Sequence, residues 1–191
     1  MGHSKQDVVE AALGILDEHG LPGLSMRRVA ATLEVQQSAL YWHFESKQVL
    51  LAAMAEEILR RGPRASSRGT WDAVVTRRAG ALRDALLAYR DGAEVVSTVY
   101  AFGLGANAPH QDLAACLEAA GATTADARAA ATVIVHFVFG FTFSEQQYHQ
   151  ASSAGAIRDV PAPNGVRRGT KADPFRAGIA LVLDGIRARL T

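Results

Sequence analysis

Apolar residues recur in this chain at steps of three and four residues almost from end to end, which is the spacing of amphipathic helices. In the first example, Val9, Ala12, Leu13 and Leu16 share one helix face. The sequence contains neither an alternating strand pattern nor an internal repeat. It therefore predicts an all-α fold.

Short helices are predicted in the first part of the chain. Gly20 ends the first helix, and Pro22 prevents its early resumption. Ser25 can cap a second helix. The inward-facing residues of this second helix are expected to be Val29, Ala30 and Leu33. Residues 36–44 predict a third short helix.

A fourth helix is predicted over residues 47–61. Ser46 can cap its start, and Gly62 with Pro63 ends it. Its inward-facing residues are expected to be Leu50, Leu51, Met54 and Ile58. The stretch that follows, 62–70, is loop-like and forms the best domain boundary.

Helical patterns continue beyond the boundary. Three of them precede a long helix, 124–150, which Thr123 can cap. The middle of the long helix, 133–143, is apolar on nearly every side, so we expect it to be covered all round. A loop is predicted over 151–171 and a final helix over 174–190, with Asp173 and Pro174 at its start.

Four aromatic residues stand together in the stretch "SALYWHFESK", 38–47. The second and third helices have the dimensions of a helix-turn-helix, in which the second helix lies in the DNA major groove. Leu40 and Phe44 would pack inward and leave Tyr41, Trp42 and His43 for other contacts. The alternative is that the aromatic residues are core residues of a small bundle.

Particular side chains of this region suit contacts to DNA. Gln37 can pair with an adenine edge, and the Ala39 methyl can touch a thymine methyl. Arg27 could reach a guanine, and Lys47 could meet a phosphate. Acidic and basic residues are almost equally numerous in residues 1–64, so DNA affinity must come from a local cluster of basic side chains.

Composition excludes several other classes of protein. The chain has 191 residues, a formal net charge of +1 and a single cysteine, Cys116, so a disulfide framework or a multi-cysteine zinc site is excluded. Acidic residues near the start argue against a signal peptide. The sequence has no uncharged apolar run long enough for a membrane span, so none is expected. We expect a cytoplasmic protein that needs no cofactor. The histidines at 110, 136 and 149 are not at metal-ligand spacing, which argues against a metal site and an enzyme.

The segment 23–54, "GLSMRRVAATLEVQQSALYWHFESKQVLLAAM", resembles the DNA-binding region of the TetR family of transcriptional repressors. "LLAYRDGAEV" (86–95) and "HFVFGFTFSEQQYHQ" (136–150) resemble the ligand domain of its tetracycline-repressor branch. The resemblance implies a helix-turn-helix headpiece (1–46), a linker helix (47–61) and a ligand-binding and dimerisation domain (65–191). It also implies a homodimer that binds a palindromic double-stranded DNA operator.

Individual positions also match the family's DNA-contacting positions. Arg27, Gln37 and Ala39 match positions that contact bases. The positions that match backbone contacts or support of the recognition helix are Ser25, Tyr41, Trp42, His43 and Lys47. Ser38 replaces a proline of the tetracycline repressors, and Met26 replaces a hydroxyl that meets phosphate, so the operator need not be theirs.

The effector is expected to differ from theirs as well. Tetracycline repressors hold their drug through magnesium, yet Val96 replaces the metal-binding histidine and Ser144 replaces an acidic ligand. Val96 cannot supply the oxygen ligands that magnesium requires. We therefore expect a small, largely hydrophobic or aromatic effector.

The resemblance also implies which residues form the wall of the effector site. They are Arg78, Leu82, Leu86, Val96, Val99, Tyr100, Phe102, Leu113, Leu117, His136 and Phe139. Such a mostly apolar wall with a few polar groups is typical of a small-molecule site. The alternative is that these residues simply pack the core, and His136 in particular could equally be a core histidine. The arginines between 60 and 90 are interpreted as a solvated face, apart from Arg78, for which an inward role stays open.

The expected mechanism is a shift in population between two spacings of the recognition helices, transmitted through the helix 47–61. A regulator of the same fold that activates transcription, or that is controlled by a protein partner, is the alternative.

Overall fold

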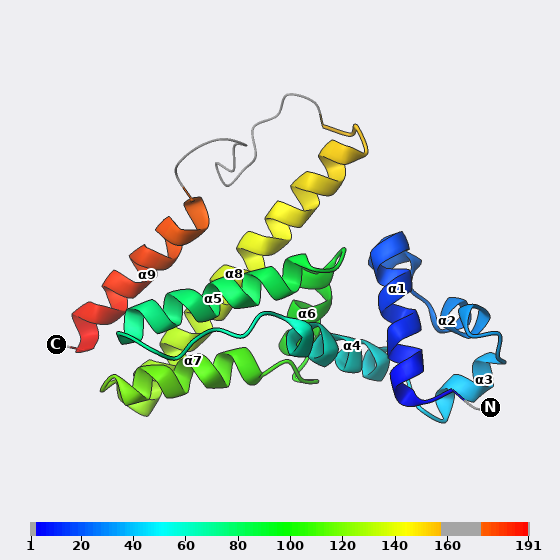
Figure 1. The fold of residues 1–191 in the computed structure, drawn as a ribbon, viewed down its shortest axis with the longest axis horizontal. Helices are drawn as coiled ribbons and strands as arrows, with labels where there is room; N and C mark the ends of the chain where they lie inside the picture. Colours follow the sequence, from blue (N-terminus) through cyan, green and yellow to red (C-terminus); the bar gives the residue numbers. More distant parts are fainter. Residues whose placement is uncertain (1–2, 158–172, 191) are drawn as a thin grey trace. The chain divides into compact units, whose positions relative to one another are not determined.

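Every regular element in the described part of the chain is a helix (Figure 1). The computed structural model describes residues 3–157 and 173–190. Its helices are α1 (Lys5–Gly23), α2 (Met26–Thr32), α3 (Gln37–Tyr41), α4 (Lys47–Arg61), α5 (Trp71–Leu87), α6 (Gly92–Ala101), α7 (Ala108–Ala119), α8 (Thr124–Ser153) and α9 (Pro174–Leu190). The predicted all-α fold is confirmed.

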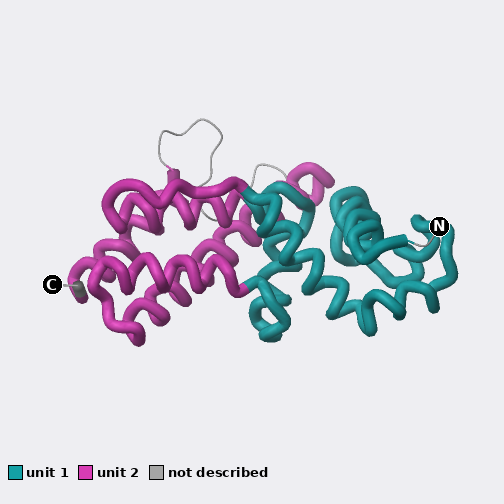
Figure 2. Tube along the Cα trace, turned by 60° about the horizontal axis from the view of Figure 1, so that its bottom comes forward, with its two compact units in different colours: residues 1–62, 85–106 teal, residues 63–84, 107–191 magenta. Residues whose placement is uncertain are grey.

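The chain forms two compact units, coloured separately in Figure 2. Unit 1 contains Met1–Gly62 and Ala85–Ala106, and unit 2 contains Pro63–Asp84 and Asn107–Thr191. Helix α5 therefore begins in unit 2 and ends in unit 1. The predicted ranges 1–46, 47–61 and 65–191 divide the chain at other points and stay predictions.

Unit 1 has an apolar core within its N-terminal helices. Val29 of α2 is fully buried, and Leu40 and Phe44 are 1% and 3% exposed, so all three are buried as predicted. Leu33 and Leu51, which were also expected to face inward, are only half-buried. Leu33 follows the last residue of α2, where the helix no longer directs its side chain at the core.

The end of α1 differs from the prediction. Gly20 has the left-handed dihedrals φ 70° and ψ 177°, so the helix is interrupted there as expected. It resumes at once, however, and continues to Gly23. Pro22 is compatible with this resumption because a proline in the first turn of a helix loses no hydrogen bond.

Side-chain caps set the starts of several helices, because the first N–H groups of a helix lack partners within it. The hydroxyls of Ser25, Ser46 and Thr123 each accept a hydrogen bond from the backbone N–H three residues later, at 3.2 Å. Asp173 accepts from the backbone of Phe175 at 3.1 Å at the start of α9. All four predicted caps are confirmed.

Helices α7 and α8 of unit 2 pack against each other. Leu113 and Leu117 of α7, together with Ala131 and Ile134 of α8, are at most 1% exposed. The His110 ring nitrogen Nε2 lies 3.1 Å from the Thr132 hydroxyl, which ties the start of α7 to α8. The two helices form one apolar layer.

The prediction that residues 133–143 are covered all round is wrong for the single chain. One face of α8 is buried, but Val133 and Phe143 are 53% and 41% exposed. The described helices of unit 2 are too few to surround α8 completely. The helix also reaches Ser153, so residues 151–153 are helical rather than part of the predicted loop, and residues 158–171 of that loop lie outside the described residues.

Helix α9 packs against α8 through aromatic rings. Phe175 stacks on Phe137, with ring centroids 5.7 Å apart. Gly178 allows this approach, because a Cβ atom there would lie 2.3 Å from the Phe137 ring. Ile179 and Leu183 of α9 are buried as well.

Candidate functional site

The second and third helices form a helix-turn-helix within unit 1. Four residues separate α2 from α3. Glu34, in this turn, has a positive φ of 56°, and the Val35 N–H donates to the Ala30 carbonyl at 3.0 Å. This sharp turn holds α3 against α2, as the helix-turn-helix prediction requires.

The α3 surface is rich in exposed side chains. Trp42 is 89% exposed and Tyr41 is 46% exposed, so neither is the core aromatic of the alternative interpretation. Gln37 and Ser38 are exposed, whereas Ala39 and His43 are half-buried. An almost fully exposed tryptophan costs free energy in water unless a partner covers it.

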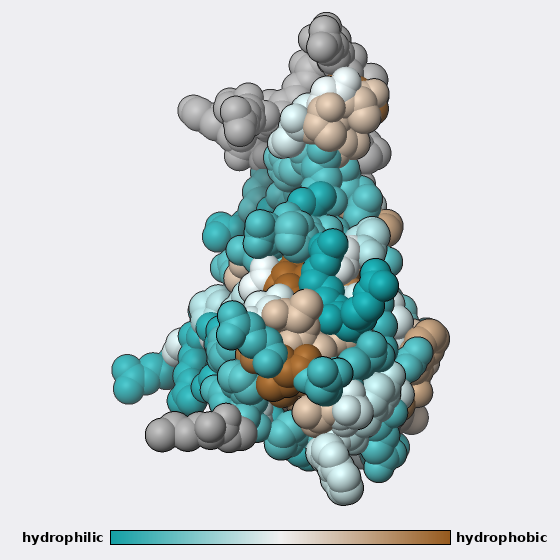
Figure 3. All heavy atoms as spheres, turned by 90° about the vertical axis from the view of Figure 1, so that its right-hand side faces the viewer, coloured by the Kyte–Doolittle hydropathy of each residue, from teal (hydrophilic) through white to brown (hydrophobic). Residues whose placement is uncertain are grey.

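A hydrogen bond joins Gln37, a predicted base-contacting residue, to Tyr41, a predicted backbone-contacting residue. The Gln37 amide Nε2 donates to the Tyr41 hydroxyl at 3.2 Å, one helical turn further along. This bond orients the Gln37 amide, the group that can pair with an adenine edge. Figure 3 shows one face of the molecule, which is mostly hydrophilic with smaller hydrophobic patches.

Basic side chains flank α3 on neighbouring elements. Arg27 is exposed near the start of α2, and Lys47 is the first residue of α4. A shallow cavity beside the Ser25 cap is lined by both Arg27 and Arg28. Arg28 was not among the predicted DNA-contacting residues, although its place beside Arg27 in the sequence could have indicated it. Guanidinium groups beside a helix start suit phosphate contacts.

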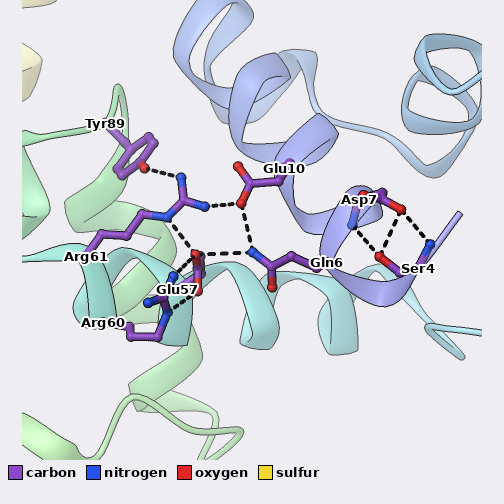
Figure 4. Close-up of polar contacts among 8 residues, drawn as sticks. All are labelled: Ser4, Gln6, Asp7, Glu10, Glu57, Arg60, Arg61 and Tyr89. Atoms are coloured by element: carbon purple, nitrogen blue, oxygen red, sulfur yellow. Dashed lines mark hydrogen bonds and ion pairs between the residues drawn. The ribbon is translucent and has the colours of Figure 1, made fainter.

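A buried carboxylate near the end of α4, that of Glu57, is paired with two arginines of the same helix (Figure 4). Glu57 is 7% exposed and accepts two hydrogen bonds from Arg60, at 2.7 and 2.6 Å, and one from Arg61 at 2.6 Å. The Arg60 hydrogen bonds lower the pKa of Glu57 to about 2, with Arg61 contributing. The carboxylate therefore stays ionised despite its burial.

The same network reaches α1 and the segment before α6. Arg61 pairs with Glu10 of α1, and its Nη1 donates to the Tyr89 hydroxyl at 3.1 Å. Gln6 donates to both Glu10 and Glu57. Arg60 and Arg61 are exposed, as the solvated-face interpretation predicts, but both also bind the buried Glu57 carboxylate. Their spacing of three and four residues from Glu57 could have indicated the local part of the network.

A second polar contact joins α1 to the start of α6. The Asp91 carboxylate accepts a hydrogen bond from the Leu21 backbone N–H at 2.8 Å. Asp91 is 4% exposed and has a positive φ of 55°. Gly20 must lack a side chain here, because a Cβ atom would lie 2.7 Å from the Asp91 carboxylate. The end of α6 is held too, since Glu56 of α4 accepts from the Ala106 N–H at 2.7 Å.

The residues of the predicted effector wall differ in exposure. Those that are buried are Leu82, Leu86, Val96, Val99, Leu113, Leu117 and Phe139. Tyr100 is half-buried, His136 is exposed and Phe102 is 66% exposed, so Phe102 is an unsuitable wall residue within this chain. The wall residues belong to both units, and that they form one site stays a prediction.

Two polar members of the predicted wall have partners within unit 2. Arg78 donates to the Asp112 carbonyl of α7 and, at 3.3 Å, to the Ser67 hydroxyl. The His136 Nδ1 atom lies 2.8 Å from the Thr132 carbonyl, one turn earlier in α8. Within residues 3–157 and 173–190, no group of three or more His, Cys, Asp or Glu side chains is arranged to hold a metal ion.

Comparison with known proteins matches both parts of the chain to family models. Residues 8–54 match the model of bacterial regulatory proteins of the tetR family. Residues 63–190 match the tetracyclin repressor-like C-terminal domain. The chain is 34% identical to the tetracycline repressor protein class A from transposon 1721 of Escherichia coli, over 95% of this chain and 89% of that protein.

Solved structures agree with the sequence comparisons. The crystal structure of Mycobacterium smegmatis BioQ is similar with a TM-score of 0.85 and 41% identity, covering 97% of this chain and 98% of that one. BioQ in complex with its double-stranded DNA operator is similar with a TM-score of 0.79 and 39% identity, covering 97% and 99%. Together with the two family models, these similarities show that the chain belongs to the TetR family of bacterial transcriptional regulators.

Proposed function

We propose that this chain is a ligand-responsive transcriptional repressor. In this proposal a cytoplasmic homodimer binds a palindromic operator and dissociates when a small, largely hydrophobic or aromatic effector binds. The observation that supports DNA binding most strongly is the exposed surface of α3, where Trp42 is 89% exposed beside an oriented Gln37 amide. BioQ, a relative of similar fold, has been solved with its DNA operator.

Dimerisation is supported by apolar side chains that the described chain leaves uncovered. Val133 and Phe143 of α8 and Leu181 of α9 are 53%, 41% and 75% exposed. Exposed apolar surface on neighbouring helices is typical of protein–protein interfaces. A two-fold dimer would place two recognition helices about 34–36 Å apart, which explains why the operator should be palindromic.

Helix α8 also has the length and apolar composition of a membrane-spanning helix. The central helices of soluble proteins share these properties, and one face of α8 is buried within unit 2. We therefore assign the uncovered face of α8 to a second copy of the chain.

The effector proposal rests on the character of the predicted wall. Most of its members are buried and apolar, and burial of apolar surface is the main source of affinity for a hydrophobic ligand. Val96 and Ser144 stand at positions where the resemblance places magnesium ligands. Magnesium-tetracycline is therefore not the proposed effector.

The proposed mechanism is a population shift. The effector stabilises a conformation whose recognition helices no longer match the groove spacing, typically with about 1–3 kcal/mol of coupling. Within unit 1, α4 is bound to α1 through Glu57, which accepts from Gln6, and through Arg61, which pairs with Glu10, and α1 is bound to the start of α6 by Asp91. A change in α6 could thus reach the headpiece through both contacts. A regulator of the same fold that activates transcription, or that responds to a protein partner, is the alternative, and enzymatic activity is not proposed.

Selection of random DNA duplexes by the full-length protein tests the proposal. We expect enrichment of a palindrome whose half-sites lie about one helical turn, or a multiple of it, apart. Gln37→Ala should change the enriched bases, whereas the control Gln111→Ala, at an exposed position of α7, should not. Enrichment of no sequence would contradict the proposal.

A further inference from the structure

A buried hydroxyl of unit 2 has no hydrogen-bond partner among the described residues. Thr142 of α8 is fully buried. Among the described residues, its Oγ1 atom is the buried polar side-chain atom that makes no hydrogen bond. Burial of an unpaired hydroxyl is unfavourable, because its hydrogen bonds to water are lost without replacement. A valine would fill the same volume without this cost.

Other helical hydroxyls of unit 2 show the bond that Thr142 lacks. Ser and Thr side chains in helices commonly donate to the carbonyl four residues earlier. Thr132 donates to Arg128 at 2.9 Å and Ser144 donates to Gly140 at 2.9 Å, both within α8. The Thr142 hydroxyl therefore differs from its neighbours in the same helix.

Thr142 lies on the buried face of α8. Val138 and Phe139, four and three residues before it, are 0% and 5% exposed, and Gln146, four residues after it, is 7% exposed. The buried face thus changes from apolar to polar at Thr142. Phe139 is a member of the predicted effector wall, so the hydroxyl stands on the same face, one turn along the helix.

An ion pair fixes the helical turn that contains Thr142. Glu145, three residues later, accepts hydrogen bonds from Arg83 of α5 at 2.7–3.0 Å, and its side chain is 9% exposed. The Arg83 guanidinium also lies over the Phe175 ring, 5.2 Å from its centroid. The helical turn that carries Thr142 is thereby tied to α5 before any ligand binds, which reduces the entropy lost on binding.

We propose that the Thr142 hydroxyl is the hydrogen-bonding contact for an oxygen atom of the effector. The effector would then be an apolar or aromatic molecule that bears a hydroxyl or carbonyl group, with its apolar part against Phe139. This inference rests on the proposed function, because it assigns a specificity-determining residue to the proposed effector site. It explains why a hydroxyl occupies a position where the fold alone favours valine.

A matched pair of aromatic probes tests the assignment. 1-Naphthol and 1-methylnaphthalene have nearly the same shape, but only the former bears a hydroxyl. Their dissociation constants are measured by equilibrium dialysis with fluorescence detection. After correction for the stronger transfer of 1-methylnaphthalene from water to an apolar solvent, the wild-type chain should prefer 1-naphthol about tenfold, the factor that one hydrogen bond in an apolar site provides.

Three variants separate the role of the hydroxyl from packing. Thr142→Val should abolish the preference for 1-naphthol and raise the melting temperature, whereas Thr142→Ser should retain the preference. Thr132→Val, which removes the exposed and already bonded hydroxyl of the same helix, is the control and should retain it too. DNA binding by each variant verifies that the headpiece is intact.

The outcomes distinguish the two proposals. Binding of both probes without a preference, or a preference that survives in Thr142→Val, would overturn the assignment of Thr142 and leave the proposed effector site standing. Failure of the wild-type chain to bind either probe would count against the hydrophobic effector site itself, and against Thr142 with it.

Discussion

The Asp91 carboxylate accepts a hydrogen bond from the Leu21 backbone N–H at 2.8 Å and so joins the start of α6 to the end of α1. Seventy residues separate the two partners in the sequence. Asp91 is almost fully buried, and a Cβ atom at Gly20 would lie 2.7 Å from its carboxylate. The headpiece is therefore connected to the helix that follows Asp91 by a contact that tolerates little change.

Asp91→Ala should lower the free energy of unfolding by about 2 kcal/mol, because the Leu21 N–H loses its acceptor and alanine is strained at positive φ. Asp91→Asn should cost less than about 1 kcal/mol, since asparagine keeps an acceptor oxygen and tolerates these dihedrals. Urea unfolding followed by circular dichroism measures both. The control is Asp84→Ala, at an exposed position of α5, and an equal loss in that variant would contradict the account.

Stability should depend on pH through Glu57. Its pKa is lowered from 4.5 to about 2, chiefly by Arg60, so folding favours the ionised form. The resulting stabilisation is fully present above pH 4.5 and is lost as the pH falls through the range down to about 2. The shift corresponds to about 3 kcal/mol at most.

Glu57→Gln tests this pH dependence. The difference in unfolding free energy between wild type and variant should be largest near pH 6 and should shrink as the pH is lowered towards 2.5. For Glu118→Gln, at an exposed position of α7, the difference in unfolding free energy from wild type should be small at every pH. A constant difference across the range would mean that the charge of Glu57 is not what stabilises α4.

Trp42→Ala should weaken binding to the selected operator about tenfold, since aromatic side chains at an interface contribute much of its affinity. The melting temperature should hardly change, because Trp42 is 89% exposed. Fluorescence anisotropy with labelled duplex and a thermal scan provide the two measurements. A large loss of stability with unchanged DNA affinity would assign Trp42 a structural role instead.

Leu181→Asp should weaken the dimer, because it introduces a charge into apolar surface that we assign to the interface. Leu181 is 75% exposed in the single chain, so the fold of the protomer should survive. Sedimentation equilibrium measures the association. Val49→Asp, an exposed apolar position of α4, is the control, and equal weakening by both substitutions would argue against a specific interface on α9.

Local features of the fold could be predicted from the sequence, whereas contacts between distant segments could not. Ser25 and Ser46 cap helices through backbone groups three residues away, so their roles follow from local spacing. The link between Leu21 and Asp91 depends on how the helices pack, and no local pattern indicates it. Arg61 shows both cases, because its bond to Glu57 follows helical spacing but its contact with Glu10 does not.

In the candidate site, too, some features could be predicted from the sequence and others could not. The exposure of Trp42 is consistent with the predicted recognition helix, because Leu40 and Phe44 alone fill the inward face. The unpaired hydroxyl of Thr142 could not be predicted, since its neighbours Thr132 and Ser144 have ordinary partners and the sequence does not distinguish them.

Transcription in vitro with purified RNA polymerase, from a promoter that contains the selected operator, tests the central claim most directly. The account predicts fewer transcripts when the full-length chain is added and recovery of transcription when an oxygen-bearing aromatic effector is supplied. An increase in transcripts on addition of the chain would contradict repression and favour the activator alternative.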